Sequence, residues 1–137
     1  DMTVLPIQVP HRDEYSETVG YILAGSQKKA LFIPDIDKWE KWTDLIEDWI
    51  AKVDYAFLDG TFYDAAEVNN RPISEIPHPF IVESMNRFSD LPTTEKNKIY
   101  FIHLNHTNPI LIPGHPYRVE LEKQGFRVAE FGAQFKL

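Results

Sequence analysis

The chain alternates short apolar runs, rich in β-branched residues, with segments of helical periodicity, and this order restricts its fold more than any other feature. Runs of this composition are typical of β-strands, and Gly25 with Ser26 supplies a turn that makes two of them a hairpin. Strands separated by helices favour an α/β fold, with a mostly open sheet on which the helices pack. The predicted strands are residues 4–10, 18–24, 30–34, 55–58 and 99–103.

Helical periodicity is strongest after Asp35. Apolar residues recur there at steps of three and four, which predicts one helical stripe that Asp35 or Asp37 can cap. The members of the stripe are Trp39, Trp42, Leu45, Ile46, Trp49, Ile50 and Val53. Residues 59–77 form a long polar segment, and such loops are usually functional or mobile.

The second half of the chain predicts two more helices and a final pair of strands. A helix over residues 80–88 follows a proline at its first turn, and one over residues 117–124 ends at Gly125. Residues 126–131 and 134–137 are predicted as the terminal strands. The chain has the length of a single domain, residues 1–137.

Charge and cysteine content exclude several classes of partner. The formal net charge of −7 disfavours nucleic acid, because phosphate binding needs a positive surface. No apolar run reaches the roughly 18 to 20 residues of a membrane span. The sequence has no cysteine, so a metal must be held by histidine or carboxylate, and we expect a soluble, cytoplasmic protein with neither a membrane nor a nucleic-acid partner.

Four predicted strands end in a group that can bind metal or transfer a proton. His11 follows VP, Asp35 follows LFIP, Asp59 follows YAFL and His103 follows YFI. In an open α/β sheet the carboxyl ends of the strands share one edge, where ligands bind. Histidine and carboxylate are ligands of zinc or iron when no thiolate is available, and a two-metal site needs a bridging carboxylate.

Each of these residues also has a simpler interpretation. Asp35 and Asp37 could be helix caps, and Asp59 could belong to a turn. His11 could lie in a surface loop, and His103 could be a hydrogen-bonded core histidine. Their coincidence at one predicted sheet edge favours a site, because the simpler interpretations would all have to hold together.

Five segments of the sequence resemble one known family. They are VPHRDEYSETVGYIL, LFIPDIDKWEKW, FLDGTFYDAAE, IYFIHLNHTNPIL and GFRVAEFGAQFKL. They look like the C-terminal half of the coenzyme PQQ (pyrroloquinoline quinone) synthesis protein B family, a branch of the metallo-β-lactamase superfamily. The resemblance implies the C-terminal half of an αβ/βα sandwich, a mixed sheet with helices on one face.

The resemblance also implies roles for the residues at the strand ends. His11 and His103 correspond to metal ligands, and Asp35 to the carboxylate that bridges two metals. Asp59 and His78 correspond to an acid–histidine pair that, in the related tRNA-processing branch, is thought to protonate a leaving group. His78 lies between two prolines and could equally be a loop histidine.

The loop HLNHTNP is expected to complete the site. Asn105, Thr107 and Asn108 would orient a small-molecule substrate or brace the metal ligands, while His106 departs from the asparagine of the family. The histidine-rich cluster of the superfamily has no counterpart here, which would leave each metal about two protein ligands short. We therefore expect a fragment of a longer protein, favoured by the abrupt start at Asp1, or a truncated relative.

Two functions remain open at this point. The first is a metal-dependent hydrolase-like or oxygenase-like enzyme of PQQ biosynthesis, using zinc or iron. The second is a non-catalytic binding or assembly module of the same fold. In either case we expect an apolar sheet face that pairs with the missing N-terminal half or with another copy of the chain. A nucleotide-binding module is disfavoured because no glycine-rich loop follows a strand, and the tRNA-processing branch because of the acidic charge.

Overall fold

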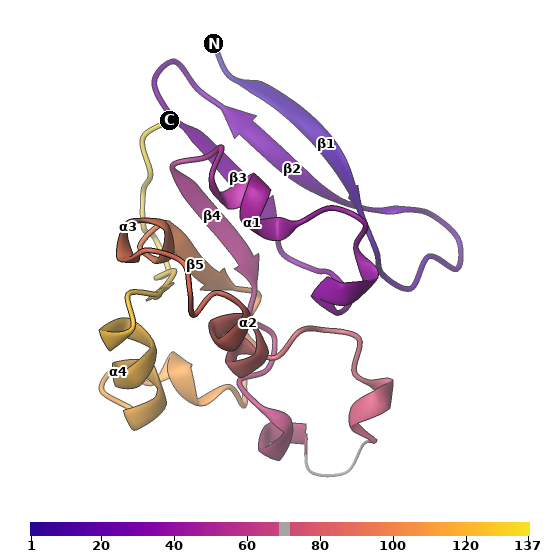
Figure 1. Ribbon diagram of the computed structural model, residues 1–137, viewed down its shortest axis with the longest axis vertical. Coiled ribbons are helices and arrows are strands. Elements are labelled where there is room, and N and C mark those ends of the chain that lie inside the picture. The colour runs from indigo at the N-terminus through magenta and orange to yellow at the C-terminus, as the bar shows by residue number, and fades with distance from the viewer. Residues whose placement is uncertain (69–71) are drawn as a thin grey trace.

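The computed structural model describes residues 1–68 and 72–137, which form one mixed six-stranded sheet (Figure 1). Its strands lie side by side in the order of the sequence. The first three pair antiparallel, and the remaining pairs are parallel. The predicted α/β class is confirmed. The strands are β1 (Thr3–Val9), β2 (Thr18–Ala24), β3 (Lys29–Ile33), β4 (Tyr55–Asp59), β5 (Ile99–Ile102) and β6 (Arg127–Val128).

The topology of the sheet determines on which face the α-helices lie. Each parallel connection steps in the same direction across the sheet, and right-handed crossovers in one direction place their helices on the same face. The predicted helices over 80–88 and 117–124 are confirmed within a residue or two at each end. No helix in the described ranges is long and apolar enough to cross a membrane. The helices are α1 (Ile46–Ile50), α2 (Ile81–Arg87), α3 (Thr93–Lys96) and α4 (Pro116–Lys123).

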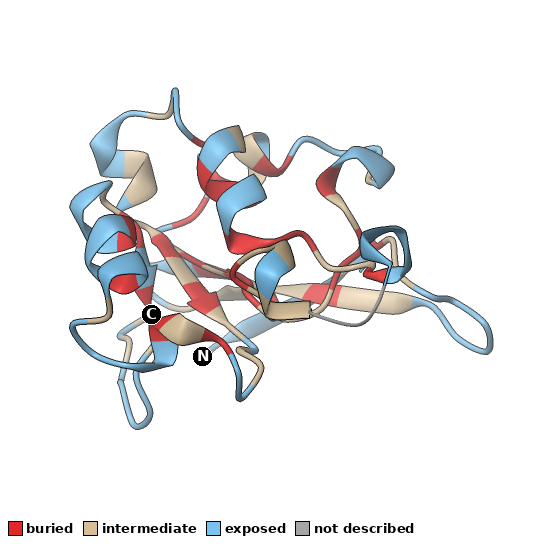
Figure 2. Ribbon diagram, turned by 90° about the horizontal axis from the view of Figure 1, so that it is seen from below, coloured by how far each residue is buried: buried red, intermediate tan, exposed pale blue. Residues whose placement is uncertain are grey.

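The hydrophobic core lies between the sheet and these helices (Figure 2). Alternate residues of a strand point to opposite faces, and Leu31, Leu58 and Phe101 from three neighbouring strands are completely buried on the helical side. Phe88, at the end of α2, is equally buried and belongs to the same core. The core fixes the ends of the central strands and so positions the residues that follow them.

The single helix expected over residues 39–53 is wrong. The segment contains a 3-10 turn, η1 (Trp39–Lys41), and the short helix α1, with extended backbone at Trp42 between them (φ −85°, ψ 132°). The Trp42 indole donates a hydrogen bond to the backbone carbonyl of Gln8 in β1, at 3.1 Å. This contact to another element holds Trp42 in a position that a continuous helix would not give it, so tertiary structure overrides the helical period.

The final strand expected over residues 134–137 is also wrong, because these described residues form no strand. The strand before it, β6, is only two residues long. Instead Phe135 packs edge-on against aromatic rings of the sheet, with centroid distances of 4.8 to 5.2 Å. Burial of a phenyl ring on this face replaces strand pairing as the interaction that holds the tail. The rings in contact are those of Tyr55, Phe57 and Tyr100.

Candidate metal site

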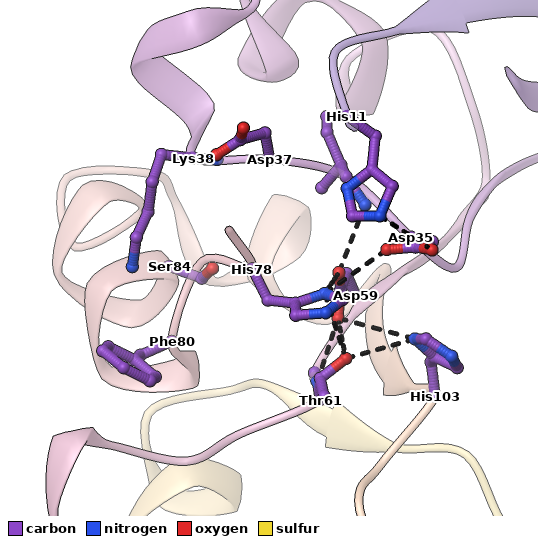
Figure 3. Close-up of polar contacts among 12 residues, drawn as sticks. His11, Asp35, Asp37, Lys38, Asp59, Thr61, His78, Phe80, Ser84 and His103 are labelled. Atoms are coloured by element: carbon purple, nitrogen blue, oxygen red, sulfur yellow. Dashed lines mark hydrogen bonds and ion pairs between the residues drawn. The ribbon is translucent and has the colours of Figure 1, made fainter. Parts of the chain in front are cut away.

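The four residues singled out at the strand ends meet at one edge of the sheet (Figure 3). Strands β1, β3, β4 and β5 run in the same direction, because β1 and β3 are both antiparallel to β2 and the later strands are parallel to β3. His11 and Asp35 lie two residues beyond their strands, Asp59 is the last residue of β4, and His103 directly follows β5. The expected convergence is therefore found.

Asp35 lies between two histidines. One carboxylate oxygen is 3.4 Å from His11 Nε2, and the other is 3.4 Å from His78 Nδ1. Neither Asp35 nor Asp37 occupies an N-cap position. Those positions belong to Lys38 for η1 and Leu45 for α1, so the predicted capping role is wrong.

Asp59 is completely buried and is surrounded by hydrogen-bond donors. Its Oδ2 accepts from His78 Nδ1 at 2.8 Å and from the Ile36 backbone N–H at 3.2 Å. Its Oδ1 accepts from the Thr61 hydroxyl at 2.6 Å and the Thr61 backbone N–H at 2.9 Å. Burial raises the pKa of this carboxyl, but His103, His78 and the Thr61 hydroxyl outweigh burial and lower the pKa to about 2. Asp59 is therefore ionised at neutral pH.

His103 has a left-handed backbone, with φ of 59°, and it is the sole residue other than glycine with positive φ in the described ranges. Such a conformation costs about 1 kcal/mol or more and persists where the surroundings fix it. Its Nδ1 is 3.1 Å from the Thr61 hydroxyl and 3.9 Å from Asp59 Oδ1. The pKa of His103 is raised by Asp59, which outweighs the opposing effect of burial.

The cluster has the composition and spacing of a metal site. Ligand atoms of Asp35, Asp59, His78 and His103 all lie within 4.8 Å of one another, and His11 adds a fifth group beside Asp35. Two buried atoms here, Asp35 Oδ1 and His11 Nδ1, have no hydrogen-bond partner among the described residues. Buried polar atoms are normally satisfied, so these two fit residues that need a further ligand. Imidazole and carboxylate together fit zinc or iron.

Asn108 supports the turn that carries Asp59. It is 2% exposed, and its amide donates to the backbone carbonyls of Gly60 at 2.9 Å and Thr61 at 3.2 Å. Of the two roles expected for Asn108, its contacts are those of a brace, because its amide is buried against backbone.

Asn105 and Thr107 connect the two loops that border the site. The backbone N–H of Asn105 donates to the Thr61 carbonyl at 2.9 Å, and its side-chain amide donates to Thr107 Oγ1 at 2.6 Å. The Thr107 hydroxyl in turn donates to Glu67 Oε1 at 2.5 Å. This chain of bonds holds the loop after β5 against the loop after β4, whereas His106 is exposed.

Thr61 and Glu67 are the site residues that sequence reasoning missed. A threonine two residues after a strand-end aspartate is a turn pattern that could have indicated Thr61, since its backbone N–H and hydroxyl both bond that aspartate. No sequence signal indicated Glu67, because its partner Thr107 lies 40 residues away.

Comparisons with known proteins agree on one superfamily. A family profile described as "Beta-lactamase superfamily domain" matches residues 1–104. The chain is 31% identical over 126 residues to coenzyme PQQ synthesis protein B of Gluconobacter oxydans, an alignment that covers 88% of the chain. It is 30% identical over 129 residues to the protein of the same name from Methylobacterium radiotolerans, which covers 90% of the chain.

A solved structure shares the fold. The crystal structure of zinc-bound PqqB from Methylobacterium extorquens superposes on 99% of the chain with a TM-score of 0.78, at 22% sequence identity. The chain spans 40% and 42% of the length of the two curated relatives and 50% of the solved one.

Proposed function

The chain belongs to the beta-lactamase superfamily and is similar to coenzyme PQQ synthesis protein B, and we propose that it carries the C-terminal part of a metal-dependent active site of that kind. The proposed enzyme is hydrolase-like or oxygenase-like and acts on a small molecule in PQQ biosynthesis. The observation that carries the proposal is the meeting of Asp35, Asp59, His78 and His103 within 4.8 Å at one sheet edge.

We assign His11, Asp35 and His103 as metal ligands. Asp35 Oδ2 is 3.4 Å from His11 Nε2, and Asp35 Oδ1 has no hydrogen-bond partner among the described residues, so both oxygens would be available to metal, as a bridging role requires. Zinc or iron bound here would supply Lewis-acid polarisation of a substrate oxygen. Three such ligands are fewer than a complete pair of sites needs, so we propose that the N-terminal half of a longer protein, or a second copy, completes the set.

His78 and Asp59 are proposed as the acid–base pair. Asp59 holds His78 Nδ1 at 2.8 Å, which leaves Nε2 as the atom that exchanges a proton with a leaving group. The carboxylate fixes the orientation of the ring. His78 is only partly buried, as a group that reaches a substrate must be.

Zinc titration of the purified, metal-free chain tests the proposal. Zinc binding is expected by calorimetry, weak because the chain supplies only part of the ligand set, and its affinity should fall about tenfold or more in His103→Ala and His11→Ala, since each loses a ligand. His106→Ala, an exposed histidine in the same loop as His103, serves as the control and should bind as the wild type does. A non-catalytic module predicts no zinc binding at these residues, and equal affinity in all four proteins would contradict the ligand assignment.

The sheet face opposite the helices carries a row of aromatic side chains. Tyr21, Phe32, Phe57 and Tyr100 lie in register across four adjacent strands and are only partly buried, and Phe135 covers one end of the row. Exposed apolar patches of this kind mark interaction surfaces.

We therefore propose that this aromatic row pairs with an N-terminal half or with another copy. Light scattering after size-exclusion chromatography is expected to give at least the dimer mass for the isolated chain. Phe32→Lys should lower that mass to the monomer, because it places a charge in the apolar interface. A monomeric wild type would count against the proposal.

A further inference from the structure

The hydroxyl of Thr61 lies beside three groups of the site. Its oxygen is 2.6 Å from Asp59 Oδ1, 3.1 Å from His103 Nδ1 and 3.3 Å from His78 Nδ1 (Figure 3). A hydroxyl has one proton and two acceptor lone pairs. The group that accepts the hydrogen bond from this hydroxyl therefore decides which ring nitrogen of each neighbouring histidine carries a proton.

The Thr61 hydroxyl donates its hydrogen bond to Asp59. A carboxylate can only accept, and this contact is the shortest of the three, as expected for a hydrogen bond to a charged oxygen. The other positions around the carboxylate are occupied by the backbone N–H groups of Ile36 and Thr61 and by His78 Nδ1. The Thr61 oxygen is left as an acceptor toward the imidazoles.

The two histidines share Asp59 unequally. His78 Nδ1 is 2.8 Å from Asp59 Oδ2, so its proton is directed to the carboxylate and the Thr61 contact is secondary. His103 Nδ1 is 3.9 Å from Asp59 Oδ1, too far for a hydrogen bond, and is closest to the Thr61 hydroxyl. His103 reaches the carboxylate only through Thr61.

We propose that Thr61 is a positioning residue that accepts a hydrogen bond from His103 Nδ1–H and so leaves the lone pair of the ring on Nε2, the nitrogen that would then be free to bind a metal. The metal part of this inference rests on the proposed function, whereas the tautomer of His103 does not. The hydroxyl is well fixed for this role, because the Thr61 carbonyl accepts from the Asn105 backbone N–H at 2.9 Å and the Asn108 amide at 3.2 Å.

The tautomers can be measured in the metal-free protein. Long-range ¹H–¹⁵N correlation spectra at an alkaline pH where both imidazoles are neutral should show His103 protonated on Nδ1 in the wild type. Thr61→Ser keeps the hydroxyl and should keep this tautomer. Thr61→Val has nearly the same shape without the hydroxyl, and His103 should shift toward the Nε2–H form while His78 keeps Nδ1–H against Asp59.

Zinc affinity provides the second readout. Thr61→Val should bind zinc about tenfold or more weakly than the wild type, and Thr61→Ser should bind nearly as tightly. Wild-type His103 protonated on Nε2, or an unchanged His103 tautomer in Thr61→Val, would overturn the proposal. If no variant binds zinc, the proposed function fails, but the spectra still decide the role of Thr61. If Thr61→Val does not fold, the spectra of the wild type and Thr61→Ser provide the test.

Discussion

Replacing Asp59 with asparagine is expected to destabilise the fold by about 3 kcal/mol and to weaken zinc binding about tenfold or more. The buried carboxylate accepts from two backbone N–H groups, the Thr61 hydroxyl and His78. A carboxamide of the same shape offers only one accepting oxygen, and its NH₂ group would face donors. Urea denaturation at neutral pH measures the first effect, and zinc titration measures the second.

The same carboxylate predicts how stability depends on pH. The folded pKa of Asp59 is about 2, below its ordinary value of 3.8, so the ionised form stabilises the fold. This contribution, about 2 kcal/mol, is fully present above the unfolded pKa and is lost as the pH falls through about 2. The free energy of unfolding of Asp59→Asn should therefore lie furthest below that of the wild type at neutral pH. The difference between the two should shrink as the pH is lowered.

Asp90→Asn is the matched control for this prediction. Asp90 is exposed, so the same chemical change there should alter the free energy of unfolding by less than about 0.5 kcal/mol. An Asp59→Asn protein as stable as this control would show that the carboxylate is not fixed by the donors around it.

Trp39→Ala is expected to lower the free energy of unfolding by about 3 to 5 kcal/mol, the range for removing a large aromatic side chain from a core. Trp39 is 4% exposed and packs against Phe88 of the core at a centroid distance of 6.1 Å. Its indole N–H donates to the completely buried hydroxyl of Ser84 in α2, at 2.9 Å. The substitution leaves a cavity and removes the hydrogen-bond partner of a buried hydroxyl.

Trp49→Ala provides the comparison within the same segment. Trp49 is only partly buried, stacks on Trp42 at a ring-centroid distance of 6.3 Å, and donates an indole hydrogen bond to the exposed Asp44. Its replacement should therefore lower the free energy of unfolding by only about 1 to 2 kcal/mol. Denaturant unfolding of both variants measures the difference. Equal costs would contradict the broken segment seen in the structure and would fit the single helical stripe predicted from the sequence.

The broken helical segment over residues 39–53 shows that hydrophobic periodicity alone was not sufficient to predict its structure. The spacing of the tryptophans is helical, but it takes no account of β1, whose Gln8 carbonyl accepts the hydrogen bond of Trp42. Phe135 is a similar case, because residues 134–137 were predicted as a strand, whereas Phe135 packs against three aromatic rings of the sheet. In both cases the deciding partner is distant in the sequence.

The sequence by itself determined the order of strands and helices and the positions of His11, Asp35, Asp59 and His103 at strand ends. These follow from local composition and from one general property of the topology, since strands that run in the same direction end at the same edge. Only the tertiary structure decided that His78 bonds Asp59, that Thr61 links Asp59 to His103, and that Asn108 braces the turn. Most of these contacts join residues 19 to 48 positions apart, and a hydrogen bond depends on distances and directions that only the packed core fixes.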